Sequence, residues 1–494
     1  IASGGNYNVV VGDEAGTAIT TGDGNVFTGY ASGDALTLGS NNTAIGRDSL
    51  GADTRGNHSV AIGRNALTTQ NFTSATDAYN TAVGSSAGAA VTTGDSNTLI
   101  GALAGDALTE GTDNVVVGKS SLSADTLGSR SVALGKNTLS AQNFTSATNT
   151  YNTAVGHDAG KAVTTGVQNT LIGGLAGDAL TDADNNVAIG YHSLNADTLG
   201  SKSVAVGPYA LYSQNFTSAT NSFNTAVGAD AGLLVTTGTQ NTLIGGLAGD
   251  ALTTGYHNVA LGYAALTADT LGRSTVAIGN EALSTQNFTS ATDSFNVAVG
   301  DQAGKSVTTG SINTLIGGLS GDALTDGNSN VAVGYDSLGA ETRGDRNVAI
   351  GVAALQVQNN TSNVDAYNTA VGYGAGALVT TGIANTLIGG LAGDVLTDAD
   401  FNVAVGQSAL SADTLGSRSV AVGSSALASQ NFTSATDGFN TAVGHVAGYA
   451  ISTGVQNTLI GGQAGDALSD ADSNTAVGYG ALTTDTLGSA SVAL

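Results

Sequence analysis

The sequence lacks several residue types on which compact soluble domains rely. Cysteine, methionine and tryptophan are absent, and Pro208 is the one proline in 494 residues. Without cysteine the chain can have neither a disulfide framework nor thiol chemistry. Charged residues make up 10% of the chain, well below the roughly 25% usual for soluble domains. These shortages argue against a row of ordinary globular domains.

Positive charge and long apolar runs are also scarce. Thirteen Lys and Arg stand against 38 Asp and Glu, which gives a net charge of −25. Such a chain repels phosphate backbones, so we expect no nucleic-acid partner. No apolar run approaches the ~20 residues that span a bilayer, and no basic leader precedes Ile1. Because the sequence ends at Leu494 within a repeated motif, we expect it to be a segment of a longer fibre.

Glycine, in contrast, is abundant, with 72 residues, and it marks a strict repeat. The motif Asn-(Thr/Val)-X-X-Gly returns every 72 residues from Asn8 onward. Within one block the motif begins at Asn80, Asn97, Asn114 and Ser131, so the units are 17, 17, 17 and 21 residues long. This register predicts 28 coils in seven repeats, which cover residues 8–79, 80–151, 152–223, 224–295, 296–367, 368–439 and the truncated 440–494. Positions in a coil are numbered below from the residue that heads its motif.

A single coil reads as short strands between glycine corners. Thr98, Leu99 and Ile100 favour β-structure, and Gly101 ends the run. Glycine stands at this fifth position in all 27 complete coils, which predicts a corner with positive φ or a close approach between coils. Residues 104–109 predict a second short strand. A helix is excluded, because glycine and β-branched residues dominate and no 3.6-residue period appears.

Coils of equal length predict an all-β, parallel β-solenoid, continuous over residues 1–494. Equivalent strands would pair ~4.8 Å apart, which gives a rod of roughly 130 Å. The asparagine at the head of most coils would hydrogen-bond to its equivalents in a ladder. Neighbouring coils stabilise one another in such a repeat protein.

The strands are apolar on both faces. Position four is Val, Ile or Leu almost everywhere, as in Ile100, so we expect positions two and four to form the interior of the coil. Position three, as in Leu99, is also apolar and would then point outward. A strand that is apolar on both faces is covered on both faces. We therefore predict a homo-oligomer, most simply a trimer, in which other copies cover the outer face.

The runs SVAIGRNAL (residues 59–67) and NTAVGSSAG (residues 80–88) resemble the YadA-like head repeats of trimeric autotransporter adhesins. Similar repeats also occur in bacteriophage tail fibres and other bacterial surface fibres. The resemblance extends over essentially the whole chain. It implies a left-handed β-roll, a homotrimer and a role in attachment to surfaces. The coils of 17 and 21 residues are longer than the usual head coil of that family.

Acidic residues recur at two positions. Asp106 represents position ten of every second coil, and Asp125 represents position twelve of every third coil. Both are weak candidates for calcium, which takes six to eight oxygen ligands, but Asp beside a glycine corner more often shapes a turn. We therefore expect no metal and no other cofactor. A basic residue often ends the third coil, as in Arg130, and we expect it to pair with the nearby acids.

No constellation in the sequence predicts catalysis. The five histidines are scattered, and no Ser recurs beside both a His and an Asp. Each acid is repeated seven times, whereas a glycosidase needs one cleft with paired carboxylates. We expect neither catalytic residues nor enzymatic activity in this chain.

The four extra residues of the wide coil lie around the sequence QNFTSAT. Insertions in solenoids often form the binding face. The loop could fold its aromatic residue back against the coil or expose it. Asn360 replaces the aromatic residue in block 296–367, and loss of a core Phe would leave a cavity. We therefore expect an exposed surface-contact loop, whose candidate residues are Phe72, Phe144, Phe216, Phe288 and Phe432.

The resulting hypothesis is an extracellular or cell-surface fibre, structural or adhesive, that contacts a glycan, a host surface or an abiotic surface. It could also pack end to end as a self-assembling filament. The alternative is the shaft of a bacteriophage tail fibre, a virion appendage. Ice binding is a third hypothesis, which the expected inward direction of the position-two threonines disfavours.

Overall fold

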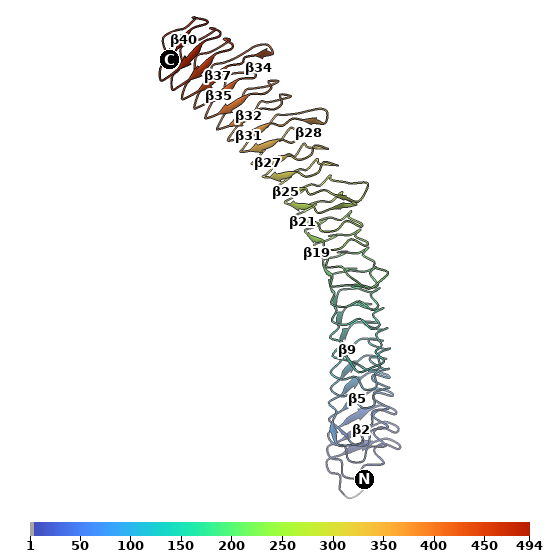
Figure 1. Ribbon diagram of the computed structural model, residues 1–494. Helices are drawn as coiled ribbons and strands as arrows, with labels where there is room; N and C mark the ends of the chain where they lie inside the picture. Colours follow the sequence, from blue (N-terminus) through green and yellow to red (C-terminus); the bar gives the residue numbers. More distant parts are fainter. Residues whose placement is uncertain (1–3) are drawn as a thin grey trace. The chain divides into compact units, whose positions relative to one another are not determined.

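The computed structural model describes residues 4–494, so the first three residues of the expected solenoid lie outside the described part. The chain forms two compact units, residues 1–243 and 244–494. Both units are parallel β-solenoids with one short strand in each coil (Figure 1). No helix occurs in residues 4–494. The predicted all-β solenoid is confirmed.

In the first unit the main strands are three residues long and follow one another up the stack. They are β1 (Val9–Val11), β2 (Val26–Thr28), β3 (Thr43–Ile45), β5 (Val60–Ile62), β7 (Thr81–Val83), β8 (Thr98–Ile100), β9 (Val115–Val117), β11 (Val132–Leu134), β13 (Thr153–Val155), β14 (Thr170–Ile172), β15 (Val187–Ile189), β17 (Val204–Val206) and β19 (Thr225–Val227). The boundary between the units falls within β20 (Thr242–Ile244).

The second unit repeats this arrangement. Its main strands are β21 (Val259–Leu261), β23 (Val276–Ile278), β25 (Val297–Val299), β26 (Thr314–Ile316), β27 (Val331–Val333), β29 (Val348–Ile350), β31 (Thr369–Val371), β32 (Thr386–Ile388), β33 (Val403–Val405), β35 (Val420–Val422), β37 (Thr441–Val443), β38 (Thr458–Ile460), β39 (Thr475–Val477) and the shorter β40 (Val492–Ala493). Pairing is parallel and in register, as between Leu99 and Val116.

Each wide coil adds a two-residue strand pair away from the main sheet. The pairs are β4 (Gly56–Asn57) with β6 (Thr76–Asp77), β10 (Gly128–Ser129) with β12 (Thr148–Asn149), β16 (Gly200–Ser201) with β18 (Thr220–Asn221), β22 (Gly272–Arg273) with β24 (Thr292–Asp293), β28 (Gly344–Asp345) with β30 (Val364–Asp365), and β34 (Gly416–Ser417) with β36 (Thr436–Asp437). The extra residues therefore stay in a loop, and Val132 still pairs with Thr153 across the wide coil.

The interior lies on the opposite side of the strand from the one expected. Position three is buried in every main strand from β2 to β39, whereas positions two and four are half-buried or exposed. Leu99, for example, is fully buried, and Ile100 is 38% exposed. The coil is thin, so its interior admits one column of mostly Ala and Leu, and the bulkier Val and Ile face outward. The expectation that positions two and four form the core is wrong.

The interior is packed by size complementarity over four coils. Leu99 stands at position three of a second coil, and the position-nine residues beside it are Gly88 and Gly105. A Cβ atom at Gly88 would lie 2.6 Å from Leu99 Cδ1, and one at Gly105 would lie 2.9 Å from Leu99 Cδ2. In the third coil position nine is the buried Leu122. This alternation of large and small residues gives each of the four coils its own place in the block.

The fifth-position glycine has both properties that were predicted. Gly101 has φ of 132°, and a Cβ atom there would lie 2.6 Å from the carbonyl oxygen of Gly118 in the next coil. No other residue fits this corner. The predicted second strand at residues 104–109 is wrong, since this stretch forms turns. Left-handed residues such as Leu103, with φ of 60°, bend the chain there.

The predicted asparagine ladder is confirmed. The Asn97 backbone N–H donates to Asn80 Oδ1 at 2.9 Å, and Asn97 Nδ2 donates to the Gly111 carbonyl at 2.9 Å. The next coil repeats the pattern, with the Asn114 N–H donating to Asn97 Oδ1 at 3.1 Å. Each buried amide therefore joins two coils and satisfies a backbone carbonyl.

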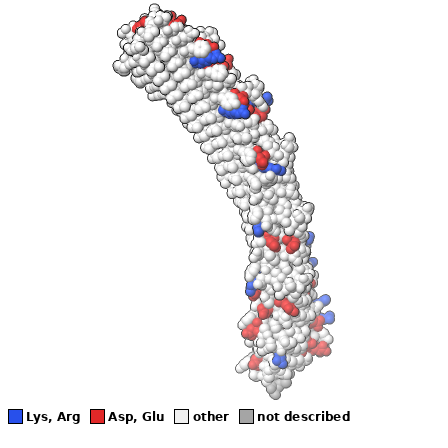
Figure 2. All heavy atoms as spheres, viewed as in Figure 1, with Lys and Arg blue, Asp and Glu red and all other residues white. Residues whose placement is uncertain are grey.

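Charge is distributed unevenly around the second unit. The flank that carries β25, β27, β31 and β35 shows no Lys, Arg, Asp or Glu, whereas blue and red atoms gather on the side of β28 and β34 (Figures 1 and 2). Positions two and four of all main strands hold only Val, Ile, Leu and Thr. This outward surface is called the strand face below.

Candidate functional site

A buried hydrogen-bond network shapes each wide coil. Gln142 Nε2 donates to Asp125 Oδ2 at 2.6 Å and to Ser131 Oγ at 3.0 Å. Gln142 Oε1 accepts from Asn152 Nδ2 at 2.9 Å. Ser131 heads this coil in place of the usual asparagine, and the Gln142 amide therefore continues the ladder where the asparagine is missing.

Asp125 is the acceptor at the centre of this network. It is fully buried, and its Oδ1 accepts from the N–H groups of Gly128 and Phe144 at 3.1 and 3.2 Å. Burial raises the pKa of Asp125, and the hydrogen bond from Gln142 opposes that rise. Both carboxylate oxygens face N–H donors, an environment that suits a structural acceptor better than a cation ligand.

Asp106 is the other acidic candidate, and its surroundings differ. It is half-buried, and its Oδ1 has no hydrogen-bond partner among residues 4–494. Burial raises the pKa of the Asp106 carboxyl as well. Across the described residues no group of three or more His, Asp or Glu side chains is placed to hold a metal ion.

The candidate phenylalanines of the wide-coil loop are buried. Phe72, Phe144, Phe216, Phe288 and Phe432 are only 4–6% exposed. The Phe216 ring lies against the backbone of the coil below, since a Cβ atom at Gly200 would come within 2.7 Å of its Cδ2. The expectation that these rings form an exposed contact surface is therefore wrong. They fold back and close the end of the wide coil.

The block without this Phe explains why the sequence was misleading. Asn360 replaces the ring and is itself buried. Its Nδ2 donates to Glu341 Oε2 at 2.9 Å, and its N–H donates to Glu341 Oε1 at 3.0 Å. Glu341 stands where the other complete blocks have Asp. The longer acid and the amide together fill the space that Asp and Phe fill elsewhere, so no empty cavity is needed.

A different set of aromatic residues is exposed. It occupies the last position of the wide coil, directly before the next asparagine, and each member has φ between 48° and 59° and is 50–92% exposed. We call this set the aromatic ladder; it consists of Tyr7, Tyr79, Tyr151, Phe223, Phe295, Tyr367 and Phe439. The sequence shows the aromatic spacing, but the positive φ and the exposure appear only in the structure.

The basic residues that end the third coil lie against this ladder. Within 6.0 Å of a ladder ring are the cationic groups of Arg130, Lys202, Arg346 and Arg418, and His58 stacks on Tyr79 at 5.2 Å. Their acidic partners are neighbouring surface residues: Asp77, Asp113, Asp365 and Asp437. The expected pairing with the acids of positions ten and twelve is wrong.

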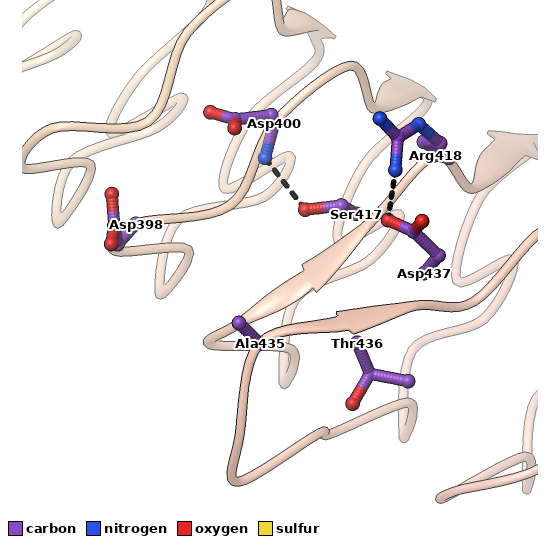
Figure 3. A pocket seen from close by; sticks show the side chains of 7 residues that line it. All are labelled: Asp398, Asp400, Ser417, Arg418, Ala435, Thr436 and Asp437. Carbon is purple, nitrogen blue, oxygen red and sulfur yellow. Dashed lines mark hydrogen bonds and ion pairs between the residues drawn. The ribbon is translucent and has the colours of Figure 1, made fainter.

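A pocket of about 380 Å³ opens beside one rung of the ladder, lined by Asp398, Asp400, Ser417, Arg418, Ala435, Thr436 and Asp437 (Figure 3). The Arg418 guanidinium forms an ion pair with Asp437 and lies over the rings of Phe401 and Phe439. The Asp400 N–H donates to Ser417 Oγ at 3.0 Å. The site thus combines two exposed rings with carboxylates, a hydroxyl and a guanidinium.

No family model matches the chain, and no characterised protein sequence matches it. Among residues 4–494 there is no helix that could cross a lipid bilayer. The functional argument therefore depends on the strand face and the aromatic ladder.

Proposed function

We propose that this chain is a segment of an extracellular structural or adhesive fibre, in which identical copies associate through the strand face. The observation that carries this proposal is the strand face itself, which is apolar and uncharged and remains uncovered in the single chain. Soluble monomers rarely expose large contiguous apolar surfaces. The chain has no catalytic role in this proposal.

Self-association is the occupant that the regular repeat favours. A second copy offers a strand face with the same spacing between coils, so contacts repeat along its length. Covering two half-exposed residues in each coil contributes roughly 1–2 kcal/mol, and association costs about 4–15 kcal/mol. About ten coils offset that cost, fewer than either unit contains. Three copies with their strand faces toward a common axis form a closed ring, the homotrimer that the adhesin resemblance implies.

The absence of cysteine from the chain permits a direct test. Val405 lies on the strand face and Thr433 in an exposed wide-coil loop. At low protein concentration, a short bis-maleimide should link chains of the Val405→Cys variant and leave chains of the Thr433→Cys variant unlinked. Equal linking of both variants, or of neither, would contradict association through the strand face.

Ice binding is a second candidate, because the position-two threonines face outward instead of inward. Thr98 and Thr170 lie half-buried on the strand face, in a regular array with Val and Ile. An ice-binding face must stay uncovered, so this function requires a monomer. Thermal hysteresis from a monomeric chain would support it, and its absence from an associated chain would exclude it.

A further inference from the structure

The aromatic ladder places bulky side chains where the backbone disfavours them. Its members have positive φ, a region that Gly, Asn and Asp adopt most readily. At the corresponding position of other coils the chain often has such residues, as at Gly24, Asn41 and Asp113. The wide coil instead has Tyr or Phe at all seven occurrences. Because at least half of each residue is exposed, burial does not compensate for the strain. Strain of this kind points to function.

The polar groups beside the rings define a ligand chemistry. At the Phe439 rung, Arg418 and the carboxylates of Asp398, Asp400 and Asp437 line one pocket next to two exposed rings. Aromatic faces bind the C–H side of a sugar ring, while carboxylates and guanidinium groups hydrogen-bond its hydroxyls. The guanidinium is already paired with Asp437. The pocket is therefore suited to a neutral, hydroxyl-rich ligand.

The spacing of the rungs indicates an extended ligand. Four coils separate successive rungs, so within each unit they are ~19 Å apart. The first unit carries Tyr7, Tyr79, Tyr151 and Phe223, and the second carries Phe295, Tyr367 and Phe439. A long polymer can contact several rungs of a unit at once, which turns weak single contacts into strong binding. The net charge of −25 repels polyanions.

From these observations we propose that the aromatic ladder is a binding site for a linear, neutral polysaccharide. The inference rests on the proposed fibre function, to which it adds the site and the ligand class. A single rung binds weakly, and affinity comes from the repetition.

Binding to microcrystalline cellulose and to chitin tests the proposal, with alginate beads as the anionic comparison. The ladder variant changes all seven members to Asn, which tolerates positive φ and should preserve folding. The control variant changes seven other exposed tyrosines to Asn: Tyr30, Tyr191, Tyr263, Tyr335, Tyr373, Tyr449 and Tyr479.

We expect the unaltered chain to bind cellulose or chitin and to ignore alginate. The ladder variant should lose at least about tenfold in bound fraction, with an unchanged or higher Tm, and the control should bind as the unaltered chain does. The proposal is overturned if the unaltered chain binds neither neutral polymer, if it prefers alginate, or if both variants lose binding equally. The cross-linking test of the strand face is independent of these outcomes, so failure of the ladder is distinguishable from failure of the fibre.

Discussion

Two aspartates with opposite surroundings provide the simplest test at the residue scale. Asp125 accepts from Gly128, Phe144 and Gln142, whereas Asp106 Oδ1 has no partner among residues 4–494. An unsatisfied buried donor costs about 1–3 kcal/mol. Asp125→Ala should therefore destabilise the chain by roughly 3 kcal/mol or more in denaturant unfolding. Asp106→Ala, the matched control, should stay within about 0.5 kcal/mol; equal losses would refute the distinction.

The exchange in block 296–367 predicts a coupling that can be measured. Phe144→Asn alone should leave a cavity and cost about 3–5 kcal/mol. Adding Asp125→Glu should recover part of the loss, because Glu341 holds Asn360 by two hydrogen bonds. A double-mutant cycle should give a favourable coupling of about 1–3 kcal/mol. A coupling near zero would show that the two positions are independent.

At the scale of the coil, two adjacent glycines separate backbone constraint from mere absence of a side chain. Gly389 has φ of 134°, and a Cβ atom there would lie 2.6 Å from the Gly406 carbonyl, whereas nothing lies within 4 Å of one at Gly390. Gly389→Ala should lower the Tm by many degrees, and Gly390→Ala should leave it nearly unchanged. Similar melting of the two variants in calorimetry would contradict the corner geometry.

The sequence was sufficient for every feature that depends on repetition. Coil length, parallel register, the Asn97 type of ladder and the corner at Gly101 follow from spacing and residue type. The inward direction of position three did not follow, because both strand faces are apolar; the small residues there, as at Ala82, were the available signal. The buried Phe144 was missed because its compensation, Glu341 for Asp, lies 19 residues from Asn360 in the sequence. Left-handed residues such as Leu103 have no signature comparable to glycine.

For the whole molecule, the buried carboxylates set the response to pH. Burial raises the pKa of Asp34, Asp106, Asp125, Asp178, Asp197, Asp269, Asp322 and Asp394. The folded chain therefore binds these protons more tightly than the unfolded chain, whose carboxyls titrate near pH ~4. The stabilisation is complete below that pH and is lost as pH rises through the raised pKa values.

Scanning calorimetry from pH 7 to pH 4 should consequently show a rising Tm. Lower repulsion within a chain of net charge −25 acts in the same direction. The double variant Asp106→Asn, Asp394→Asn should show a shallower slope, because two of the raised carboxyls are gone. A Tm that falls steadily on acidification would contradict the assignment of these groups.

Association through the strand face is the central claim about the whole molecule, and the mass of the native particle tests it most directly. The chain has a mass of 48.0 kDa. Light scattering on the unaltered chain, coupled to size exclusion and repeated after serial dilution, should give three times that mass at every concentration. A particle that stays at 48.0 kDa at all concentrations would show that the strand face remains uncovered, and the claim would be wrong.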